Sequence, residues 1–431
     1  MIDFFLTDNG GRNFLMIIAL IATLWVIIRK FVRNKILFTL VIAYVVFGFV
    51  CAFIFYVLAN NMWYAYSQKE ISIEPLLYLS LLFVVMCIPF CFFKLNSIQK
   101  IDDRYIIKYL KWIAIIAFCS SIFPFFESLI RIFTMSGQGL VNAYEGNDGA
   151  GFSLISFFSI RTRNYLHFFI TPLLFYFFYK NNMKYSCFML FSFATSLMID
   201  FVSGGRGLLV NDLNYLVFFY AVFRVLLKLE LRAKAKRIVL IGFLVVILFL
   251  SFITIARFTD GGNVVSADRR LDLLTWVFLY PGSGPCEFSR QMYSSTVRTD
   301  GDNSFAFIKT TLGLKTFKEN NKRREYWEGK QSIQNYIFYT VIGDIYSDLG
   351  WINTIIIFII LAIIMSIYIS RSTSGGSVSV QSLVLVSIYF EWLTMGIMAN
   401  CYKEYYAQFF IFVTCLICLF FTIKQKGKNF L

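Results

Sequence analysis

The feature that most constrains this chain is a succession of long hydrophobic runs separated by shorter polar segments. Most runs approach the ~20 residues that an α-helix needs to cross the core of a bilayer. A backbone surrounded by lipid must satisfy its hydrogen bonds within the segment, so each run favours a helix. With 58% hydrophobic and only 15% charged residues, the composition excludes a soluble domain. We therefore predict an all-α polytopic membrane protein in which residues 1–431 form a single integral membrane domain.

The hydrophobic runs predict about eleven transmembrane helices. They carry few charges, and polar residues gather between them rather than within them. The predicted spans cover residues 14–28, 36–58, 75–93, 112–132, 165–179, 185–202, 208–227, 238–256, 350–370, 380–399 and 407–423.

Lysine and arginine gather in every second connection between these runs, beginning with the connection after the first span. Basic connections are typical of the cytoplasmic side of a membrane protein, so we predict that the N-terminus lies outside. The net charge of +15 then reflects membrane topology, and nucleic acid is excluded as a partner. The long irregular segments fall on the non-cytoplasmic side, at residues 60–74, 134–164, 203–207, 257–334 and 400–406.

The largest extracytoplasmic loop is predicted at residues 257–334. Within it, residues 267–280 (ADRRLDLLTWVFLY) place apolar side chains at helical spacing after a charged start. This pattern predicts an amphipathic helix on the bilayer or across the mouth of a cavity. The sequence PGSGP at residues 281–285 predicts a turn that ends this helix. Residues 315–330 are highly polar and predict a solvated connection, and residues 332–349 predict a helix that leads into the ninth span.

A break at residues 203–207, SGGRG, places one arginine between two hydrophobic runs. Glycine lets the backbone turn sharply and approach a ligand, and the guanidinium of Arg206 is a planar fork suited to phosphate. The alternative is that Arg206 anchors a helix end at the membrane interface. Other outer arginines are suited to bind a lipid diphosphate bidentately, or else pair with loop carboxylates. They are Arg161, Arg163, Arg257, Arg269 and Arg270.

Acidic residues supply the other candidates. Asp344 and Asp348 lie one helical turn apart, and two carboxylates in apolar surroundings acquire different pKa values. One would then act as a base for a sugar hydroxyl or orient an arginine; the alternative is a helix-end pair at the interface. Glu391 lies inside the tenth predicted span, which indicates either function or a structural pair with an arginine. His167 fits either a base or a packed histidine.

Three features occur together in this chain: the SGGRG turn that opens an apolar helix, the long outward loop, and the sequence GDIYSDLG at residues 343–350 before the next span. In this combination the chain resembles the Wzy-type polymerases of oligosaccharide repeat units, the O-antigen and capsule polymerase group. The resemblance implies a multi-span helical bundle related to the GT-C glycosyltransferases. By position, Arg206 corresponds to the turn arginine of the family and Asp348 to its helix acid.

The resemblance also implies a substrate, a place and a partner. Members polymerise undecaprenyl-diphosphate-linked repeat units at the outer, periplasmic face of the bacterial cytoplasmic (inner) membrane. A Wzz-type chain-length regulator is the implied partner.

The sequence departs from the family at one point. The arginine-to-glycine spacing described for the outer loops of some members is absent; Arg269 to Gly284 and Arg298 to Gly313 come nearest, each one residue too short. The related O-antigen ligases use an outer-loop histidine, and their motif does not occur around His167, which favours a polymerase. A flippase of the same lipid-linked glycans is the other alternative; transporters are commonly built from internal repeats, and no convincing repeat is found.

We therefore expect a glycosyltransferase that moves a growing glycan from undecaprenyl diphosphate to a lipid-linked repeat unit in the bilayer. We expect no metal or other cofactor, because arginine can neutralise the pyrophosphate, and the chain has one histidine and no zinc or nucleotide motif. The expected catalytic residues are Arg206, Asp348 and Asp344, and the expected substrate-binding residues are Arg257, Arg161, Arg163, Arg269, Arg270, Tyr346 and Glu391.

Overall fold

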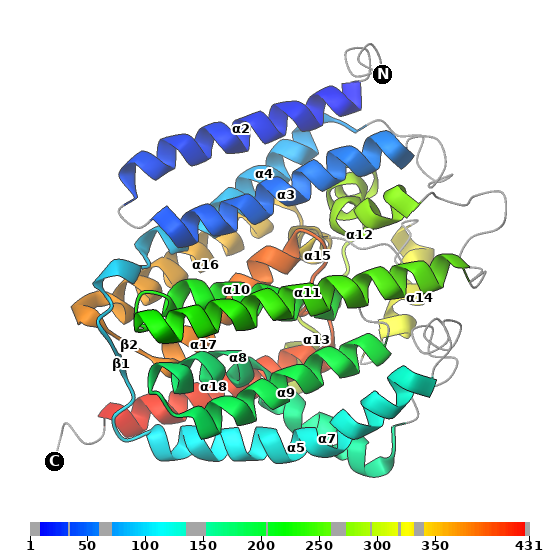
Figure 1. Ribbon diagram of the computed structural model, residues 1–431. Coiled ribbons are helices and arrows are strands. Elements are labelled where there is room, and N and C mark those ends of the chain that lie inside the picture. The colour runs from blue at the N-terminus through cyan, green and yellow to red at the C-terminus, as the bar shows by residue number, and fades with distance from the viewer. Residues whose placement is uncertain are drawn as a thin grey trace. The chain divides into compact units, whose positions relative to one another are not determined.

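The computed structural model describes residues 9–32, 35–59, 71–134, 152–203, 206–259, 273–293, 295–317, 320–331 and 340–426. Helices make up nearly all of the regular structure in these ranges (Figure 1). The strands among the described residues are β1 (Lys100–Asp102) and β2 (Ser377–Ser379), which pair in parallel. The predicted all-α class is therefore confirmed.

Each predicted hydrophobic span coincides with a helix. In the described ranges, 8 helical segments are long and apolar enough to cross a membrane. The remaining predicted spans coincide with shorter apolar helices at His167–Tyr179, Gly207–Phe223 and Val380–Gly396. The protein is thus polytopic, while the number of crossings and the relationship to the GT-C bundle stay predictions.

The chain divides into two compact units. The first comprises Met1–Lys94, Val265–Arg371 and Tyr389–Ile411, and the second comprises Leu95–Val264, Ser372–Ile388 and Phe412–Leu431. Helices α17 (Val380–Gly396) and α18 (Tyr405–Lys426) contribute residues to both units.

In the first unit, α2, α3 and α4 pack along one another, and α12 packs against α3 (Figure 1). Their apolar side chains form a core rich in phenylalanine, in which Phe14, Phe38, Phe55 and Phe83 are fully buried. The helices are α2 (Asn9–Phe31), α3 (Lys35–Ala59), α4 (Ile73–Cys87), α12 (Leu273–Glu287), α13 (Ala306–Thr311), α14 (Asn320–Gln331), α15 (Val341–Leu349) and α16 (Trp351–Ser372), with a 3-10 turn η1 (Ile88–Phe92) and a π-helix η4 (Phe288–Met292).

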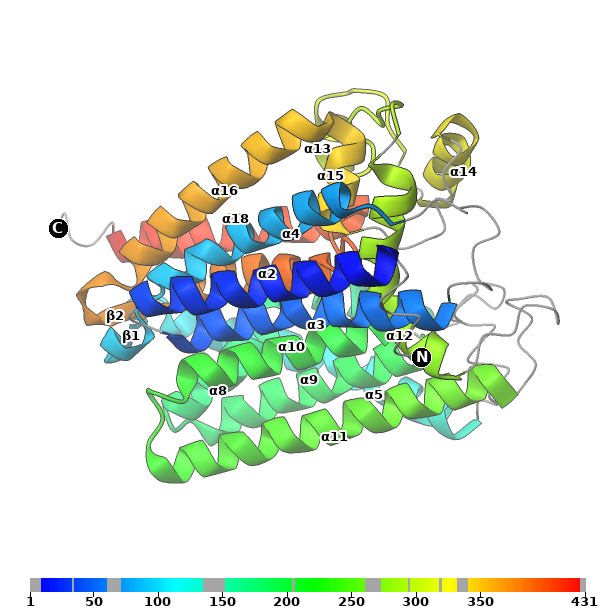
Figure 2. The ribbon, with the colours of Figure 1, turned by 90° about the horizontal axis from the view of Figure 1, so that it is seen from above.

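In the second unit, α8, α9, α10 and α11 lie side by side (Figure 2), and α5 packs against α7 and α9. Stacked rings join these helices: the ring centroids of Phe118 and Phe188 are 4.3 Å apart. The helices are α5 (Ile107–Thr134), α7 (Leu154–Tyr165), α8 (His167–Tyr179), α9 (Met183–Val202), α10 (Arg206–Phe223) and α11 (Leu229–Thr259), with 3-10 turns η2 (Leu95–Ser97) and η5 (Ser374–Gly376).

Helix α12 contradicts the turn predicted at residues 281–285, because the helix continues through both prolines to Glu287. Its second half is buried rather than lying on a surface: a Cβ added at Gly282 would come within 2.5 Å of the Cys51 carbonyl oxygen. Closely packed membrane helices tolerate proline and glycine, since neighbours satisfy the freed backbone groups and small residues allow close approach. The start of the predicted amphipathic helix, residues 267–272, lies outside the described residues.

Candidate functional site

Helix α15 presents the predicted acidic pair. The Thr340 side chain caps its start by accepting a hydrogen bond of 2.9 Å from the Gly343 backbone nitrogen, as N-cap residues do. The helix ends at Gly350, whose φ of 79° is strained for any residue with a side chain. Asp344 and Asp348 therefore lie one turn apart on one face, as predicted, and are 1% and 3% exposed. The helix does not run straight into α16, because the chain turns at Gly350.

Asp348 is held by donors from a distant loop. Its Oδ1 accepts hydrogen bonds from the Thr299 hydroxyl, at 2.5 Å, and from the Asn303 backbone nitrogen, at 3.1 Å. Its Oδ2 is buried and forms no direct hydrogen bond with the described residues, although the Ser304 hydroxyl lies close enough to lower the pKa of Asp348. Burial raises the pKa of Asp348 to about 6, against the lowering effect of these hydrogen bonds. A buried carboxylate is suited to accept a proton when its pKa is raised and one of its oxygens forms no direct hydrogen bond.

Asp344 is paired with a lysine from the connection between α17 and α18. The Nζ atom of Lys403 lies 2.8 Å from Oδ1 of Asp344, and the Lys403 side chain is 14% exposed. Burial lowers the pKa of Lys403, and the Asp344 charge opposes this effect. Arg323 of α14, 3% exposed, donates to the Lys403 carbonyl at 3.4 Å and interacts electrostatically with both aspartates. Two buried cations thus face two buried carboxylates.

Helix α14 partly corrects the solvated connection predicted at residues 315–330, because one face of the helix is buried while the other is exposed. It is helical from Asn320 to Gln331, and Trp327 is buried with its ring nitrogen donating to Asp302 at 3.1 Å. Gln331 donates to the Ser347 hydroxyl of α15 at 2.9 Å. Arg323, Trp327 and Gln331 are spaced four apart, so they share one helix face. That spacing in the sequence could have predicted a helix with one packed face. The high polarity of the segment favoured a solvated connection instead.

Tyr346, predicted to bind substrate, packs in an aromatic cluster within the first unit. Its hydroxyl donates to the Tyr293 carbonyl at 2.6 Å, and its ring stacks on the Tyr293 ring with centroids 5.6 Å apart. The Arg298 guanidinium lies over the same ring at 5.0 Å. These contacts give Tyr346 a packing role, and its role toward substrate stays a prediction.

Glu391 of α17 is 4% exposed and accepts a hydrogen bond of 2.5 Å from the Tyr402 hydroxyl. The sequence left open whether Glu391 takes part in function or pairs with an arginine, and both alternatives stay predictions. Tyr402 precedes Lys403, so Glu391 fixes the segment that carries the Asp344 partner.

A buried acid that the sequence did not indicate is Glu287, the last residue of α12. It is 0% exposed, accepts a hydrogen bond of 2.5 Å from Gln291, and lies 3.8 Å from the Arg290 guanidinium. Burial raises the pKa of Glu287 to about 7. The π-helix η4 follows at once, and π-helices recur at functional positions.

The second unit contains its own buried charge cluster. Arg163 of α7 is 4% exposed and interacts electrostatically with Asp200 of α9 and Asp212 of α10. Burial lowers the pKa of Arg163, and the two carboxylates oppose that effect. Its Nε atom is buried without a hydrogen-bond partner among the described residues. Asp200 and Asp212 flank the SGGRG turn in the sequence, and the structure brings their charges to act on Arg163.

Arg161 lies two residues before Arg163 on α7, and the sequence predicted both arginines as phosphate ligands. Side chains two residues apart on a helix point in different directions. The Arg161 guanidinium lies 5.2 Å from the Phe157 ring centroid. The structure therefore separates the two arginines, with Arg163 buried and Arg161 partly exposed.

Four predicted arginines fall where side chains are not described. Arg206 begins α10 and Arg257 lies near the end of α11, and the structure describes only their backbone. Arg269 and Arg270 lie outside the described residues. The predicted convergence of these arginines on a diphosphate stays a prediction.

His167 begins α8 and packs among aromatic rings, with ring centroids 5.4 Å from Phe168 and 6.0 Å from Tyr215. This is the packed alternative for the single histidine. Within the ranges that the structure describes, no group of three His, Cys, Asp or Glu side chains is arranged to hold a metal ion.

Comparison with known families identifies a match over the first part of the chain. The family model for O-antigen polysaccharide polymerase Wzy matches residues 1–274, which is 274 of the 431 residues. The match contains the Arg163 cluster and ends before α15. No curated protein and no solved structure matches the chain. Because more than half of its length fits the family model, this protein belongs to the Wzy family of O-antigen polysaccharide polymerases.

Proposed function

We propose that this Wzy-family polymerase transfers the growing glycan from undecaprenyl diphosphate to a hydroxyl of an incoming lipid-linked repeat unit. The acceptor oxygen attacks the reducing-end carbon of the glycan and forms the new glycosidic bond. The bond between that carbon and the diphosphate oxygen breaks, and undecaprenyl diphosphate leaves with the electron pair. The acceptor proton passes to a base on the protein. Family membership supports the polymerase activity.

The surroundings of Asp348 support its assignment as the base that accepts the acceptor proton. Its Oδ2 has no hydrogen-bond partner among the described residues, while Oδ1 is fixed by Thr299 and Asn303. With its pKa raised by burial to about 6, Asp348 is ionised at neutral pH and is a stronger base than an ordinary carboxylate. A catalytic base works best when its pKa lies close to the working pH.

Asp344 acts as a positioning residue in this proposal. Its ion pair with Lys403, at 2.8 Å, keeps a negative charge one turn from Asp348, and that charge raises the pKa of Asp348 further. Paired carboxylates in different environments commonly divide acid and base roles in this way.

Arginines supply the charge that the diphosphate requires. Arg206 and Arg257 are the first candidates, because they stand at the ends of α10 and α11. Arg163 is a further candidate, because its Nε is unused among the described residues. Guanidinium groups bind phosphate oxygens bidentately and stabilise negative charge on a leaving group. We therefore propose that the reaction needs no metal ion, with Arg161, Arg269 and Arg270 as secondary ligands.

The place of the reaction follows from the basic connections. Their alternation supports an active site on the periplasmic side of the inner membrane. A Wzz-type regulator is the proposed partner that sets glycan length.

Reconstitution in liposomes with a purified lipid-linked repeat unit tests the function. Longer glycans on the carrier, formed equally with a metal chelator present, are the expected result. Movement of the repeat unit across the bilayer without lengthening would instead assign a flippase, and transfer to lipid A core would assign a ligase. If lengthening stops with the chelator and returns with a divalent ion, metal independence is wrong while the polymerase assignment stands.

A further inference from the structure

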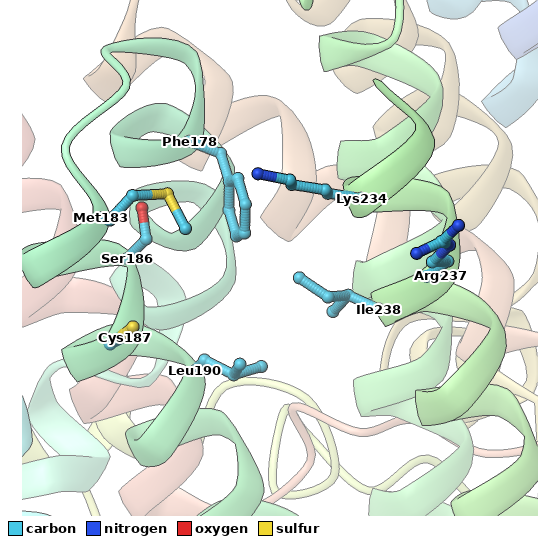
Figure 3. Close-up of a pocket in the computed structure, with 8 residues that line it drawn as sticks. All are labelled: Phe178, Met183, Ser186, Cys187, Leu190, Lys234, Arg237 and Ile238. Carbon is cyan, nitrogen blue, oxygen red and sulfur yellow. The ribbon is translucent and has the colours of Figure 1, made fainter. Parts of the chain in front are cut away.

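A groove opens in the second unit where the end of α8 and the starts of α9 and α11 meet. Its volume is about 280 Å³. Figure 3 shows Met183 and Leu190 on the α9 wall, Ile238 on the α11 wall and the ring of Phe178 between them. These side chains give the groove a long apolar lining, as expected for a surface that faces lipid chains.

Two cations line the same groove from α11. Lys234 and Arg237 are three residues apart, so they lie on one face of the helix, and Figure 3 shows Lys234 extending toward Phe178. Neither side chain forms a hydrogen bond or an ion pair with any residue that the structure describes. No acidic residue lines the groove. Two uncompensated positive charges therefore border an apolar wall.

The position of these cations along α11 places them at the level of lipid headgroups. They stand directly before the apolar run at residues 238–256, which is about 28 Å long at 1.5 Å per residue. That length nearly equals the ~30 Å core of a bilayer. The chain turns between α8 and α9 at residues 180–182. The end of α8 and the starts of α9 and α11 therefore lie at one membrane surface.

A second groove on α11 offers a contrast. It has a volume of about 390 Å³ and is lined by three basic residues, Arg224, Arg232 and Lys236. Arg232 donates to the Leu227 carbonyl at 3.3 Å and is already engaged. The other half of the lining is Leu229, Ala233 and the ring of Tyr220. This groove carries charge without a long apolar wall.

We propose that the groove between α8, α9 and α11 binds an anionic phospholipid. Lys234 and Arg237 bind the headgroup phosphate, and part of one acyl chain lies against Phe178, Leu190 and Ile238. Basic pockets between transmembrane helices on the cytoplasmic side bind anionic headgroups in this manner, and the predicted orientation places this end of α11 in the cytoplasm. The site is separate from the proposed transferase chemistry, which takes place at the outer face.

Cys187 provides a direct probe, because it lines the groove and is exposed. In detergent, saturating phosphatidylglycerol is expected to slow maleimide labelling of Cys187 severalfold, because the bound lipid covers the thiol. Phosphatidylcholine and inorganic phosphate are expected to leave labelling within about twofold. The exposed thiols of Cys119 and Cys415 lie outside the groove and serve as internal controls.

Variants separate this groove from general basic charge. Lys234→Ala with Arg237→Ala is expected to raise the phosphatidylglycerol concentration that gives half-maximal protection about thirtyfold, because two basic contacts are lost. Arg224→Ala with Lys236→Ala removes the same charge from the neighbouring groove and is expected to change that concentration less than about threefold. Continued protection of the buried thiols of Cys51 and Cys87 from maleimide shows that each variant is folded.

A third variant tests the apolar wall. Leu190→Trp fills the groove and keeps both cations, so less phosphatidylglycerol should remain bound in native mass spectrometry. Equal protection by phosphatidylcholine, protection by inorganic phosphate alone, equal losses in the two double variants, or unchanged lipid retention in Leu190→Trp would each overturn the proposal.

Discussion

The buried charges of the two units are held in different ways. In the first unit, Asp348 accepts hydrogen bonds from neutral donors, and Asp344 pairs with Lys403 at 2.8 Å. In the second unit, Arg163 interacts electrostatically with Asp200 and Asp212, and its Nε has no hydrogen-bond partner among the described residues. Neutral donors leave one carboxylate oxygen of Asp348 open, whereas the second cluster keeps a permanent positive charge.

This difference indicates a division of roles. A carboxylate whose pKa is raised to about 6 gains and loses a proton near neutral pH, so the first cluster suits proton transfer. A guanidinium keeps its charge at any physiological pH, so the second cluster suits anion binding or structural pairing. Substitutions in the two clusters test whether that division is correct.

The largest effect is expected from Asp348→Asn. The change removes the proposed base and keeps the shape of the side chain, so elongation in proteoliposomes should fall by about a hundredfold to ten-thousandfold. Asp300→Asn is the matched control: it is exposed, and its φ of 50° suits asparagine, so its rate should stay within about twofold. A wild-type rate for Asp348→Asn would remove this residue from the mechanism.

Lys403→Met should have the next largest effect, on stability. It leaves Asp344 buried without its cation, which costs about 3 to 5 kcal/mol. The double change with Asp344→Leu should recover most of this loss. Lys180→Met is the control: Lys180 pairs with Asp103 at 2.9 Å in a partly exposed site. Asp103 keeps its hydrogen bond from the Tyr176 hydroxyl, so the change should cost less than about 1 kcal/mol. Thermal unfolding in detergent measures all three; equal losses for Lys403→Met and Lys180→Met would contradict the buried pair.

The pH dependence of stability gives a third comparison. The pKa of Asp348 rises from 3.8 to about 6 on folding, so its contribution to stability is present below pH 3.8 and is lost as the pH rises through about 6. The loss amounts to about 3 kcal/mol. Asp348→Asn lacks this titration, so it should be more stable than the wild type at pH 7 and equal to it near pH 4. Unfolding curves measured in parallel cancel the contributions of other groups; parallel curves at every pH would contradict the raised pKa.

The smallest effect is expected from Arg163→Lys. Lysine keeps the charge between Asp200 and Asp212 but lacks the planar fork that binds phosphate bidentately, so elongation should fall about tenfold. Arg104→Lys changes an exposed arginine that pairs with Asp102, and its rate should stay within about twofold. If Arg163→Lys elongates normally while Arg163→Met unfolds, the second cluster is structural.

Part of the site was predictable because it is local. The four-residue spacing of Asp344 and Asp348 predicted that they lie on one helix face. The partners were not predictable. Lys403 lies 59 residues from Asp344, and no spacing rule connects them.

The sequence by itself determined the all-α membrane class and the positions of the hydrophobic helices. Lipid offers no hydrogen bonds, so the backbone of a long apolar run must form its hydrogen bonds within the run, as a helix does. Only the tertiary structure decided that the PGSGP segment is helical, that one face of α14 is packed, and which cations face which carboxylates. Those outcomes depend on contacts between residues far apart in the chain, where close packing outweighs local turn propensity and local polarity.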